Sequence, residues 1–587
     1  MTAALFCSAM GMVVRILTHG AWIKFHVFEN AYKSVNFIAK AGASDYPFKP
    51  RHATFARSEK RLIRHGKRFP ETRATSPESL QSPTVPRPSF KTVKVRKARS
   101  RPMIAKSPVS FPPTKLYIGG QWVDGPNKVT VMNKYTGEVA HELSGAGVDE
   151  VNKAVAAAKA AQPLIAKMPI WRRAEILNKT SQLLAENRAE IAKCIAREVG
   201  KAVKYAGFEV DRAVDTFRLA AEEAAQIHGE TIPLDAVKSG EGLFGFWHRK
   251  PLGIVGAITP FNFPLNLAAH KIAPALAAGN TIVLKPAEAT SLTGAWIVAL
   301  LEEAGLPPGV INLVHGKGSV LGDAIVKHPD IAKITFTGSL EVGLNILANA
   351  GLKKVTLELG NSSPIVIAAD ADMKYAAAKA AIGANYCSGQ VCISTQRIYV
   401  EAAGYDEFKR LFVEEVKKLK VGDPLDPETD VGPLILEKDA ARVESWINEA
   451  VAEGATLLTG GTRVKNLLQP AVLENTKPTM KVISQEVFGP AVSIIKVDSF
   501  EEGLRQADDT QYGLQAAVFS RDIERVFQAI HALNFGGVVV NDCPHLRPDM
   551  IPYGGNRQSG LGREGLRFAI EEMTSIQTVM FRTGHSR

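Results

Sequence analysis

The sequence predicts an α/β protein with two domains, the first of them built on a parallel, doubly wound sheet. From Leu252 onward, short β-branched runs alternate with helix-like stretches, which is the pattern of βαβ units. After Glu358 the alternation starts again, so a second α/β domain is expected. A chain of 587 residues with 45% apolar residues is long enough to bury cores of that size.

Before Leu252, the sequence predicts a short hairpin and then a set of helices. Two apolar runs flank Gly119 and Gly120, as in a tight strand pair. Apolar residues then recur every three or four positions between charged ones, which is typical of amphipathic helices. The expected helices span residues 148–162, 170–199 and 209–227. A Gly-rich aromatic segment that ends at Trp247 favours an exposed hairpin arm suited to subunit contacts.

The strands expected in the two α/β domains are short. In the first domain they span residues 253–258, 281–285, 310–314 and 332–336. In the second they span residues 364–368 and 397–400, with a helix over residues 373–385 between them. The carboxyl ends of parallel strands meet at one edge, where open α/β sheets bind ligands.

Basic residues are concentrated near the N-terminus. Residues 1–110 contain 21 Lys and Arg against 5 Asp and Glu, a net charge of +16, while the remaining 477 residues contain 50 and 54, a net charge of −4. This extension shows no sustained periodicity and becomes rich in Arg, Ser and Pro, so mostly disordered chain is expected. The body has the charge of an ordinary, slightly acidic enzyme.

The extension has several possible roles. Its apolar run, residues 3–14, is too short to span a bilayer and lacks a preceding basic region, so neither a membrane helix nor a secretory signal is expected. A transit peptide for a plastid or mitochondrion fits its composition, whereas a chain that starts near Met103 would be cytoplasmic. A nucleic-acid-binding arm would also be basic, but sparse aromatic residues argue against it.

The cysteines of the chain are few and not closely paired. This argues against a disulfide framework and a Cys-rich zinc site and favours a reducing compartment. No metal is expected. The cysteines are Cys7, Cys194, Cys387, Cys392 and Cys543.

Cys392 is singled out by its surroundings, because it comes two residues after a Gly-Gln pair in a stretch that can hold its thiol in a tight turn. A lone cysteine is more often a buried core residue. Glu358, however, ends an apolar strand some thirty residues earlier, and its carboxylate can activate water. A thiol beside such a carboxylate suits acyl-enzyme chemistry.

Further polar motifs follow the predicted strands. Asn262 follows residues 253–258, where its amide can donate to a developing oxyanion, although Asn is also a common turn residue. Lys285 and Glu288 end the next strand and offer a cation and a carboxylate to a ribose. Four more segments, each weak alone, are residues 316–322, 336–343, 486–490 and 552–564. The first two open helices, so their amides could face a diphosphate, although neither contains Gly-x-Gly-x-x-Gly.

Together, in this order and at these separations, the motifs resemble the NAD(P)-dependent aldehyde dehydrogenase superfamily, from about residue 113 to the end. The resemblance implies a Rossmann-type dinucleotide-binding domain, an α/β catalytic domain, and a small β oligomerisation arm with a C-terminal strand. The corresponding residues are 113–230 and 252–358, then 359–565, and finally 231–251 and 566–587. It also implies a small aldehyde substrate, NAD as cofactor with NADP as the alternative, and a homodimer or homotetramer. No nucleic-acid or membrane partner is expected.

The resemblance also implies catalytic roles. Cys392 matches the nucleophile, Asn262 the oxyanion donor together with the Cys392 backbone amide, and Glu358 the base for deacylation. Lys271 is similar to the family's active-site lysine. We expect this lysine and the nearby helix start to lower the pKa of the Cys392 thiol.

The cofactor-binding residues follow in the same way. Lys285 and Glu288 match adenosine-ribose contacts, Ser339 a diphosphate contact, Glu486 the nicotinamide-ribose ligand and Phe488 a wall of the nicotinamide pocket. The other expected contacts are Thr259, Pro260, Phe261, Gly318, Gly322, Phe336 and Gly338. Because the Glu288 carboxylate would repel a 2′-phosphate, NAD is the expected cofactor.

One position departs from the family pattern. Asn361 stands where the family has the second glycine of Leu-Glu-Leu-Gly-Gly. A residue with a side chain tolerates positive φ only if it is Asn-like, so the local backbone is the open point of the resemblance.

Three residues indicate the substrate. Arg212 and Arg547 could clamp a carboxylate or phosphate between two guanidinium groups, with His270 as a third polar wall. Alternatively, Arg212 pairs with Glu209 or Asp215 on its own helix. We expect a small anionic or hydroxylated aldehyde, with succinate semialdehyde first.

Other activities remain as alternatives. They are a lactaldehyde dehydrogenase, a glyceraldehyde-3-phosphate dehydrogenase, in particular a non-phosphorylating one, and a CoA-acylating semialdehyde dehydrogenase. Glu358 argues against the CoA-acylating type. Cys392, Asn262 and Glu358 together argue against a catalytically inactive scaffold.

Overall fold

The computed structural model describes residues 112–583 and, nearer the N-terminus, four strands within residues 3–40. The chain divides into two compact units, Met1–Arg101 and Pro102–Arg587. The described strands of the first unit form an antiparallel meander: β1 (Ala3–Cys7), β2 (Met12–His19), β3 (Trp22–Phe28) and β4 (Val35–Lys40).

These four strands differ from the expectation of disordered chain over residues 1–110. They are rich in aromatic and β-branched residues, and in β3 the polar Lys24 and His26 alternate with apolar neighbours. Such alternation favours a strand, although the basic composition of the whole extension masks it. Residues 41–111, with Met103 and most of the Arg-, Ser- and Pro-rich part, lie outside the described residues.

The second unit contains an eight-stranded sheet in the order β25-β15-β14-β11-β12-β13-β5-β6. Its parallel centre consists of β11 (Ile254–Ile258), β12 (Thr281–Lys285), β13 (Ile311–Leu313), β14 (Ile331–Thr337) and β15 (Lys354–Glu358). These strands confirm the predicted parallel sheet. The antiparallel pair β5 (Leu116–Ile118) and β6 (Gln121–Val123) confirms the predicted hairpin. At the other edge, β25 (Gly560–Leu561) returns from near the end of the chain to pair with β15.

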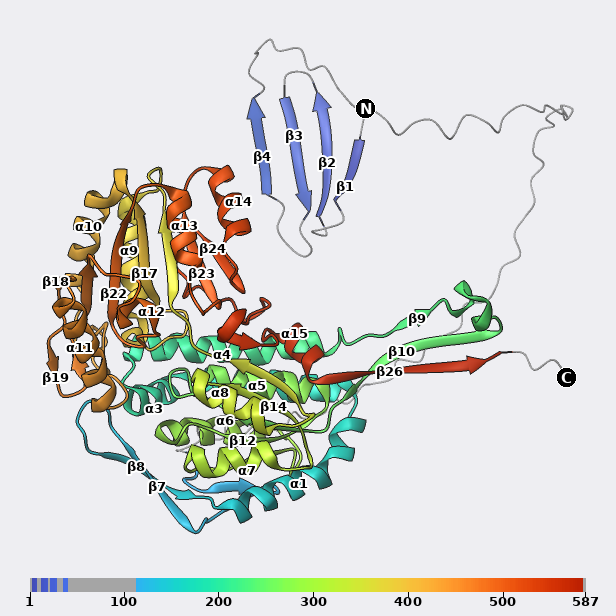
Figure 1. Ribbon diagram of the computed structural model, residues 1–587. Helices are drawn as coiled ribbons and strands as arrows, with labels where there is room; N and C mark the ends of the chain where they lie inside the picture. The colour runs from blue at the N-terminus through green and yellow to red at the C-terminus, as the bar shows by residue number, and fades with distance from the viewer. Residues whose placement is uncertain (1–2, 8–11, 20–21, 29–34, 41–111, 584–587) are drawn as a thin grey trace, which may run out of the picture. The chain divides into compact units, whose positions relative to one another are not determined.

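Two hydrophobic cores lie on opposite faces of this sheet. Successive side chains of a strand point to opposite faces, so Val255 and Ala257 of β11 belong to one core while Ile254 and Ile258 belong to the other. The first core takes residues chiefly from α2 (Ile170–Glu186), α3 (Arg188–Val199), α4 (Val203–Ala224), α5 (Asn266–Ala278) and α6 (Ser291–Glu303). The second takes them chiefly from α1 (Val148–Lys167), α7 (Asp323–Lys327) and α8 (Leu340–Asn349). The sheet is therefore covered on both faces (Figure 1).

The helices before β11 differ from the prediction in their bounds. The single helix expected over residues 170–199 is two helices, because the chain turns at Asn187, whose Nδ2 donates to the carbonyl of Leu183. The next helix starts at Val203 rather than at residue 209. It is separated from α3 by Gly200, which has a φ of 82°. Glycine adopts that left-handed conformation without steric cost and commonly ends helices.

A second, seven-stranded sheet has the order β18-β21-β22-β17-β16-β23-β24. Its strands are β16 (Ser363–Ile367), β17 (Thr395–Glu401), β18 (Thr456–Thr459), β21 (Ala471–Glu474), β22 (Ala491–Val497), β23 (Gln515–Phe519) and β24 (Gly537–Val540). The helices around it are α9 (Met373–Asn385), α10 (Tyr405–Lys417), α11 (Glu437–Ala452), α12 (Lys481–Ser484), α13 (Phe500–Asp508) and α14 (Ile523–Ala532). This sheet confirms the expected second α/β domain.

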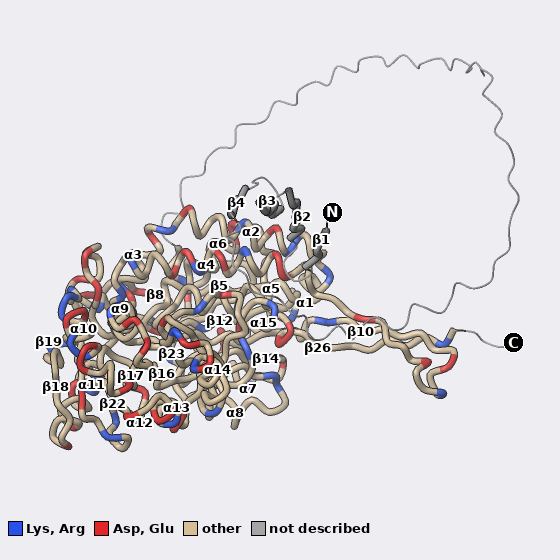
Figure 2. The backbone as a smooth tube through the Cα atoms, turned by 90° about the horizontal axis from the view of Figure 1, so that it is seen from above, with Lys and Arg blue, Asp and Glu red and all other residues tan. Residues whose placement is uncertain are grey.

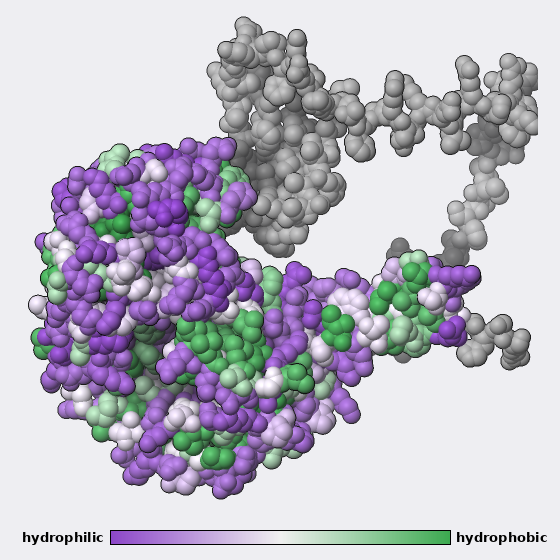
Figure 3. Space-filling view, in the orientation of Figure 1, coloured by the Kyte–Doolittle hydropathy of each residue, from purple (hydrophilic) through white to green (hydrophobic). Residues whose placement is uncertain are grey.

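A three-stranded antiparallel arm extends away from the two sheets. It consists of β9 (Glu230–Ile232), β10 (Leu243–Pro251) and β26 (Thr574–Arg582), and its last strand follows α15 (Leu566–Glu572). Figures 1 and 2 both show β10 and β26 side by side along the arm. Large apolar side chains are exposed on it, namely Phe244, Ile576, Met580 and Phe581. Figure 3 shows apolar surface along this projection. The arm predicted around Trp247 is therefore present.

Candidate active site

Cys392 lies in a tight loop between α9 and β17. The loop passes through left-handed conformations at Cys387, Ser388 and Gly389, with φ of 52°, 57° and 70°. A Cβ at Gly389 would lie 2.2 Å from the carbonyl oxygen of Gly489, so a glycine is required where the two backbones meet. The Ser388 hydroxyl donates to the carbonyl of Gly432 (2.8 Å) and helps to hold the strained turn.

Asn262 is joined directly to this loop. It lies between β11 and α5 and is buried, and its Nδ2 donates to the carbonyl of Gln390 (2.8 Å). Its Oδ1 accepts from the backbone amide of Phe263 (3.1 Å), which fixes the orientation of the amide. An amide nitrogen carries two protons, so one proton of Nδ2 is not used by the bond to Gln390.

A buried ion pair positions the Asn262 loop. Lys201 and Glu209 are fully buried and 2.5 Å apart, and Glu209 also accepts from the backbone amides of Leu265 and Asn266 at the start of α5. The Lys201 ammonium lies 3.6 Å from the ring centroid of Phe263. A carboxylate at a helix start satisfies amides that have no partner within the helix. Lys201 and Glu209 were not predicted as site residues, because this contact depends on how α4 packs against α5.

Glu358 ends β15, and its carboxylate is buried. Neither carboxylate oxygen has a hydrogen-bond partner among the described residues. Burial raises its pKa well above the usual value, the Glu564 carboxylate raises it further, and Arg547, Lys271 and Arg563 oppose the rise. A carboxyl group with a raised pKa and free oxygens can take up a proton from water, which is what a general base requires.

Lys271 is held by Glu564, a carboxylate that was not among the predicted site residues. Its ammonium donates to Glu564 Oε1 (2.8 Å) and to the Thr337 hydroxyl (2.7 Å). The other oxygen of Glu564 accepts from Arg547 (2.8 Å), and the two cations hold the pKa of this carboxyl well below its usual range. The sequence feature that could have indicated Glu564 is its position as the acidic last residue of the Gly-rich run 552–564.

The expected lowering of the Cys392 pKa is wrong for this structure. Burial, with a smaller contribution from the carboxylates of Glu486 and Glu358, raises the pKa of the thiol to about 11. A hydrogen bond with Tyr553 and the charge of Arg547 act in the opposite direction. Lys271 does not offset the burial, since its ammonium is paired with Glu564.

The three predicted substrate residues gather around Asp549 and Glu564. Arg212 donates to both oxygens of Asp549 (3.1 and 2.6 Å), so it pairs with neither Glu209 nor Asp215. His270 Nε2 lies 2.7 Å from Asp549 Oδ1, and Arg547 pairs with Glu564. Both guanidinium groups thus have a carboxylate partner already. The Arg212 side chain is 27% exposed, whereas His270 and Arg547 are buried.

The predicted cofactor residues lie at the carboxyl ends of the parallel strands. Thr259, Pro260 and Phe261 follow β11, Lys285 ends β12 and Glu288 follows it, and Phe336, Gly338 and Ser339 lie at the end of β14. Gly318 and Gly322 bound a short helical turn after β13. This edge is where an open α/β sheet binds a dinucleotide.

Two details of this edge fit a dinucleotide. The Lys285 ammonium is buried, burial lowers its pKa to about 8, and no hydrogen bond joins it to another side chain of the described residues. The Ser339 hydroxyl accepts from the Val342 amide (3.5 Å) at the exposed start of α8, where a phosphate oxygen could replace it.

Glu486 and Phe488 lie across from that edge. Glu486 Oε1 accepts from the Asn361 backbone amide (3.0 Å), and burial raises its pKa to about 7. A Cβ at Gly360 would lie 2.5 Å from Glu486 Oε2, so a side chain there would displace this carboxylate. Phe488 has a φ of 48° and meets the Phe261 ring edge-on at 5.9 Å.

Asn361 does not adopt positive φ. Its side-chain nitrogen donates to the Ser363 hydroxyl (2.6 Å) and to the carbonyl of Gln515 (3.1 Å). The departure from the family pattern therefore leaves the backbone unstrained and adds a hydrogen bond to Gln515, the first residue of β23.

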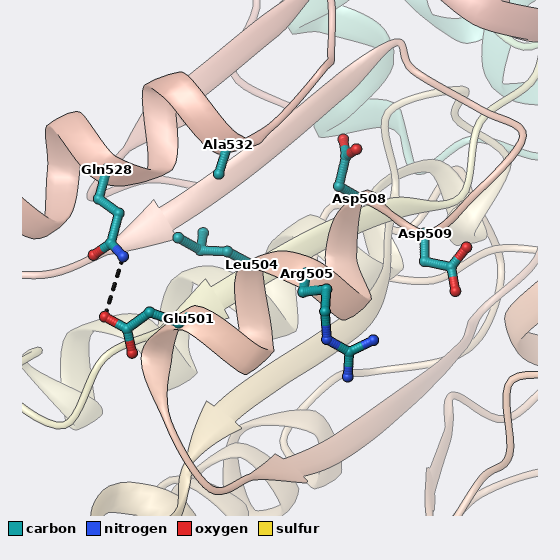
Figure 4. A pocket seen from close by; sticks show the side chains of 7 residues that line it. All are labelled: Glu501, Leu504, Arg505, Asp508, Asp509, Gln528 and Ala532. Atoms are coloured by element: carbon teal, nitrogen blue, oxygen red, sulfur yellow. Dashed lines mark hydrogen bonds between the residues drawn. The ribbon is translucent and has the colours of Figure 1, made fainter.

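A groove elsewhere in the second sheet domain contains none of the predicted residues. It has a volume of about 620 Å³ and lies between α13 and α14, where Gln528 donates to Glu501 (Figure 4). Its wall includes Asp508, which pairs with Arg557. It shows no arrangement of groups suited to the chemistry of Cys392.

Two features are absent from the described residues. No helix in that part of the chain is long and apolar enough to cross a membrane. No group of three or more His, Cys, Asp or Glu side chains there is placed to hold a metal ion.

Comparison with known proteins bears on the whole second unit. The model of the aldehyde dehydrogenase family matches residues 122–579. The chain is 44% identical to a 3-sulfolactaldehyde dehydrogenase of Priestia aryabhattai, over 79% of this chain and 97% of that protein. It is 40% identical to a lactaldehyde dehydrogenase of Methanococcus aeolicus, over 80% and 100%.

Solved structures agree with the family match. Aldehyde dehydrogenase 21 from Physcomitrella patens, in complex with the reaction product succinate, has a TM-score of 0.79 and 38% identity over 82% of this chain and 100% of its own. The glyceraldehyde-3-phosphate dehydrogenase GapN from Methanocaldococcus jannaschii, complexed with NADP, has a TM-score of 0.75 and 40% identity over 77% and 99%. Betaine aldehyde dehydrogenase from Staphylococcus aureus, in complex with NAD+, has a TM-score of 0.78 and 32% identity over 81% and 96%.

The raised pKa of Cys392 predicts a steep pH dependence of its alkylation. Because the thiolate is the nucleophile, the rate of inactivation by iodoacetamide in the absence of cofactor should rise about tenfold per pH unit from about pH 7 to 9. Peptide mass spectrometry should find the label on Cys392, since Cys387 is buried and only 2% exposed. Cys387→Ala serves as the control with an unchanged profile. A plateau below pH 8 would contradict the raised pKa.

Proposed function

The chain belongs to the aldehyde dehydrogenase family, and from this premise we propose that it oxidises a small 2-hydroxyaldehyde to the acid, using Cys392 as nucleophile, Asn262 as oxyanion donor and Glu358 as base. The observation that supports these roles is the hydrogen bond of Asn262 to the backbone of the Cys392 loop, with the unpaired carboxylate of Glu358 electrostatically coupled to the thiol.

The first half of the proposed reaction forms a thioester. The Cys392 thiolate attacks the aldehyde carbon, and the free amide proton of Asn262 and the Cys392 backbone amide stabilise the alkoxide. A bound nicotinamide would supply the hydride acceptor, with Lys285, Ser339 and Glu486 as the residues that would hold the dinucleotide. Loss of one oxyanion donor in such chemistry lowers the rate by about 10²- to 10³-fold.

The second half is hydrolysis. Glu358 takes a proton from water, which attacks the thioester and releases the acid from Cys392. Because the pKa of Glu358 is raised in the folded protein, its carboxylate form is lost at a higher pH than that of an ordinary glutamate as the pH falls. Deacylation should therefore weaken towards low pH.

Glu358→Gln tests this division of labour. The variant should retain acylation and lose deacylation, giving a burst of about one reduced cofactor per active site followed by slow turnover. Cys392→Ala is the matched control and should give no burst. Stopped-flow absorbance measures both, and steady-state turnover equal to wild type in Glu358→Gln would rule out its role as the base.

NAD is proposed as the preferred cofactor, on the basis of the exposed Glu288 carboxylate after β12. It would repel a 2′-phosphate, although nearby Lys285 and the exposure of the carboxylate moderate the effect. The similar GapN protein was solved in complex with NADP, and this favours NADP instead. Wild-type kcat/KM should be higher with NAD, and Glu288→Gln should narrow the difference. An equal or higher value with NADP in wild type would overturn this preference.

The substrate class rests on the similar lactaldehyde and sulfolactaldehyde dehydrogenases and on the state of the arginines. Arg547 is buried and locked to Glu564, whereas Arg212 is partly exposed and its Nη1 makes no hydrogen bond to the described residues. With only Nη1 of Arg212 available, the site can bind a hydroxyl or a single anionic group. It cannot form the clamp of two guanidinium groups that was expected. Succinate semialdehyde, the first choice from sequence, becomes the second candidate.

A pair of three-carbon aldehydes tests the substrate class. Wild type should have a higher kcat/KM for lactaldehyde than for propanal, which lacks the hydroxyl. Arg212→Ala should lose about ten- to a hundred-fold on lactaldehyde and little on propanal, since a hydrogen bond from a charged group contributes about 1.5–3 kcal/mol. The control is Arg188→Ala, because Arg188 makes the same two bonds to Asp211 at the surface. Equal losses on both aldehydes would refute the contact.

The arm formed by β9, β10 and β26 is proposed as an oligomerisation surface. Exposed apolar side chains on a projecting sheet are typical of subunit contacts, and the edges of its outer strands are open to pairing. A homodimer or homotetramer would cover them.

A further inference from the structure

The Cys392 sulfur has a neighbour that was not among the predicted site residues. The hydroxyl of Tyr553 lies 3.3 Å from Cys392 Sγ. Since the nucleophile is the thiolate, any donor that touches this sulfur acts on the reacting atom. We propose that Tyr553 is a further catalytic residue, whose hydroxyl donates a hydrogen bond to the Cys392 thiolate. The proposal rests on the proposed role of Cys392 as nucleophile.

Tyr553 is held in place by its backbone. Its amide donates to the carbonyl of Glu564 (3.0 Å), and the Glu564 amide donates back to the carbonyl of Tyr553 (2.6 Å). The side chain is 3% exposed. Glu564 also holds Lys271 and Arg547, so the phenol is built into the charged network rather than placed on a mobile loop.

The Arg547 guanidinium covers the Tyr553 ring. Its carbon lies 3.5 Å from the ring centroid, within the range of a cation–π contact. The positive charge draws electron density from the ring and makes the hydroxyl a better donor. In this arrangement Arg547 acts on Cys392 through Tyr553 as well as through its own charge.

Burial and the nearby carboxylates oppose ionisation of the sulfur, so a hydrogen-bond donor would favour the thiolate. Glu486 and Glu358 oppose its ionisation, and Arg547 favours it. Once ionised, the sulfur can only accept, so the phenol must donate. Burial raises the pKa of Tyr553 well above its usual value, so the phenol keeps its own proton while the thiol proton passes to water.

The test compares the pH dependence of Cys392 alkylation in wild type and Tyr553→Phe. The variant lacks the hydroxyl but keeps the ring under Arg547. Hydrogen bonds to charged groups suggest that the alkylation rate at each pH from about 7 to 9 should fall about ten- to a hundred-fold, which corresponds to an upward shift of the midpoint by about one to two pH units. Tyr553→Met, which also lacks the hydroxyl, should shift the midpoint in the same direction.

Two controls separate this effect from loss of structure. Tyr405→Phe removes another buried hydroxyl, which is bonded to Glu474 far along the second sheet, and should leave the midpoint unchanged. Thermal unfolding of every variant verifies the fold. Label on Cys392 with an unchanged midpoint in either Tyr553 variant would overturn the inference. Label on another cysteine, with loss of activity, would overturn the role of Cys392 instead.

Discussion

The buried carboxylate of Glu564 is the interaction on which the active site depends. It lies between the ammonium of Lys271 and the guanidinium of Arg547, 2.8 Å from each. Moving a charge out of water costs several kcal/mol, so none of these groups would be stable there without the others. The shared electrostatic environment shifts the pKa values of two carboxyl groups in opposite directions. That of Glu564 lies well below the usual value and that of Glu358 well above it. One carboxylate is thereby fixed as a structural anion and the other can exchange a proton.

The sequence was sufficient for the features that depend on local pattern. The parallel strands, and the motifs at their carboxyl ends, follow from β-branched runs that alternate with helical stretches. Once these strands form one sheet, Asn262, Lys285 and Ser339 must lie along the same edge. The bounds of the helices before β11 were less certain, because Asn187 and Gly200 break a periodicity that otherwise continues.

Features that depend on long-range packing were missed. Glu564 and Asp549 meet Lys271 and Arg212 across 293 and 337 residues of chain, and nothing in the local sequence pairs them. The direction of the Cys392 pKa was missed for the same reason, since burial outweighs the nearby cations. Asn361 shows the reverse case. The sequence marked it as unusual, and only the structure shows that its side chain bonds to Ser363 and Gln515.

The pairing of β25 with β15 has a consequence for how the protein is made. The first sheet acquires its edge strand only when Gly560 and Leu561 have been synthesised, close to the end of the chain. The same is true of the ion pair between Lys271 and Glu564. Until then, a ribosome-bound chain holds Lys271 without the carboxylate that balances its charge, at the stage when incomplete domains are prone to aggregate. A chain that ended before Glu564 would leave Lys271 and Arg547 without their shared carboxylate, however much of its core had formed.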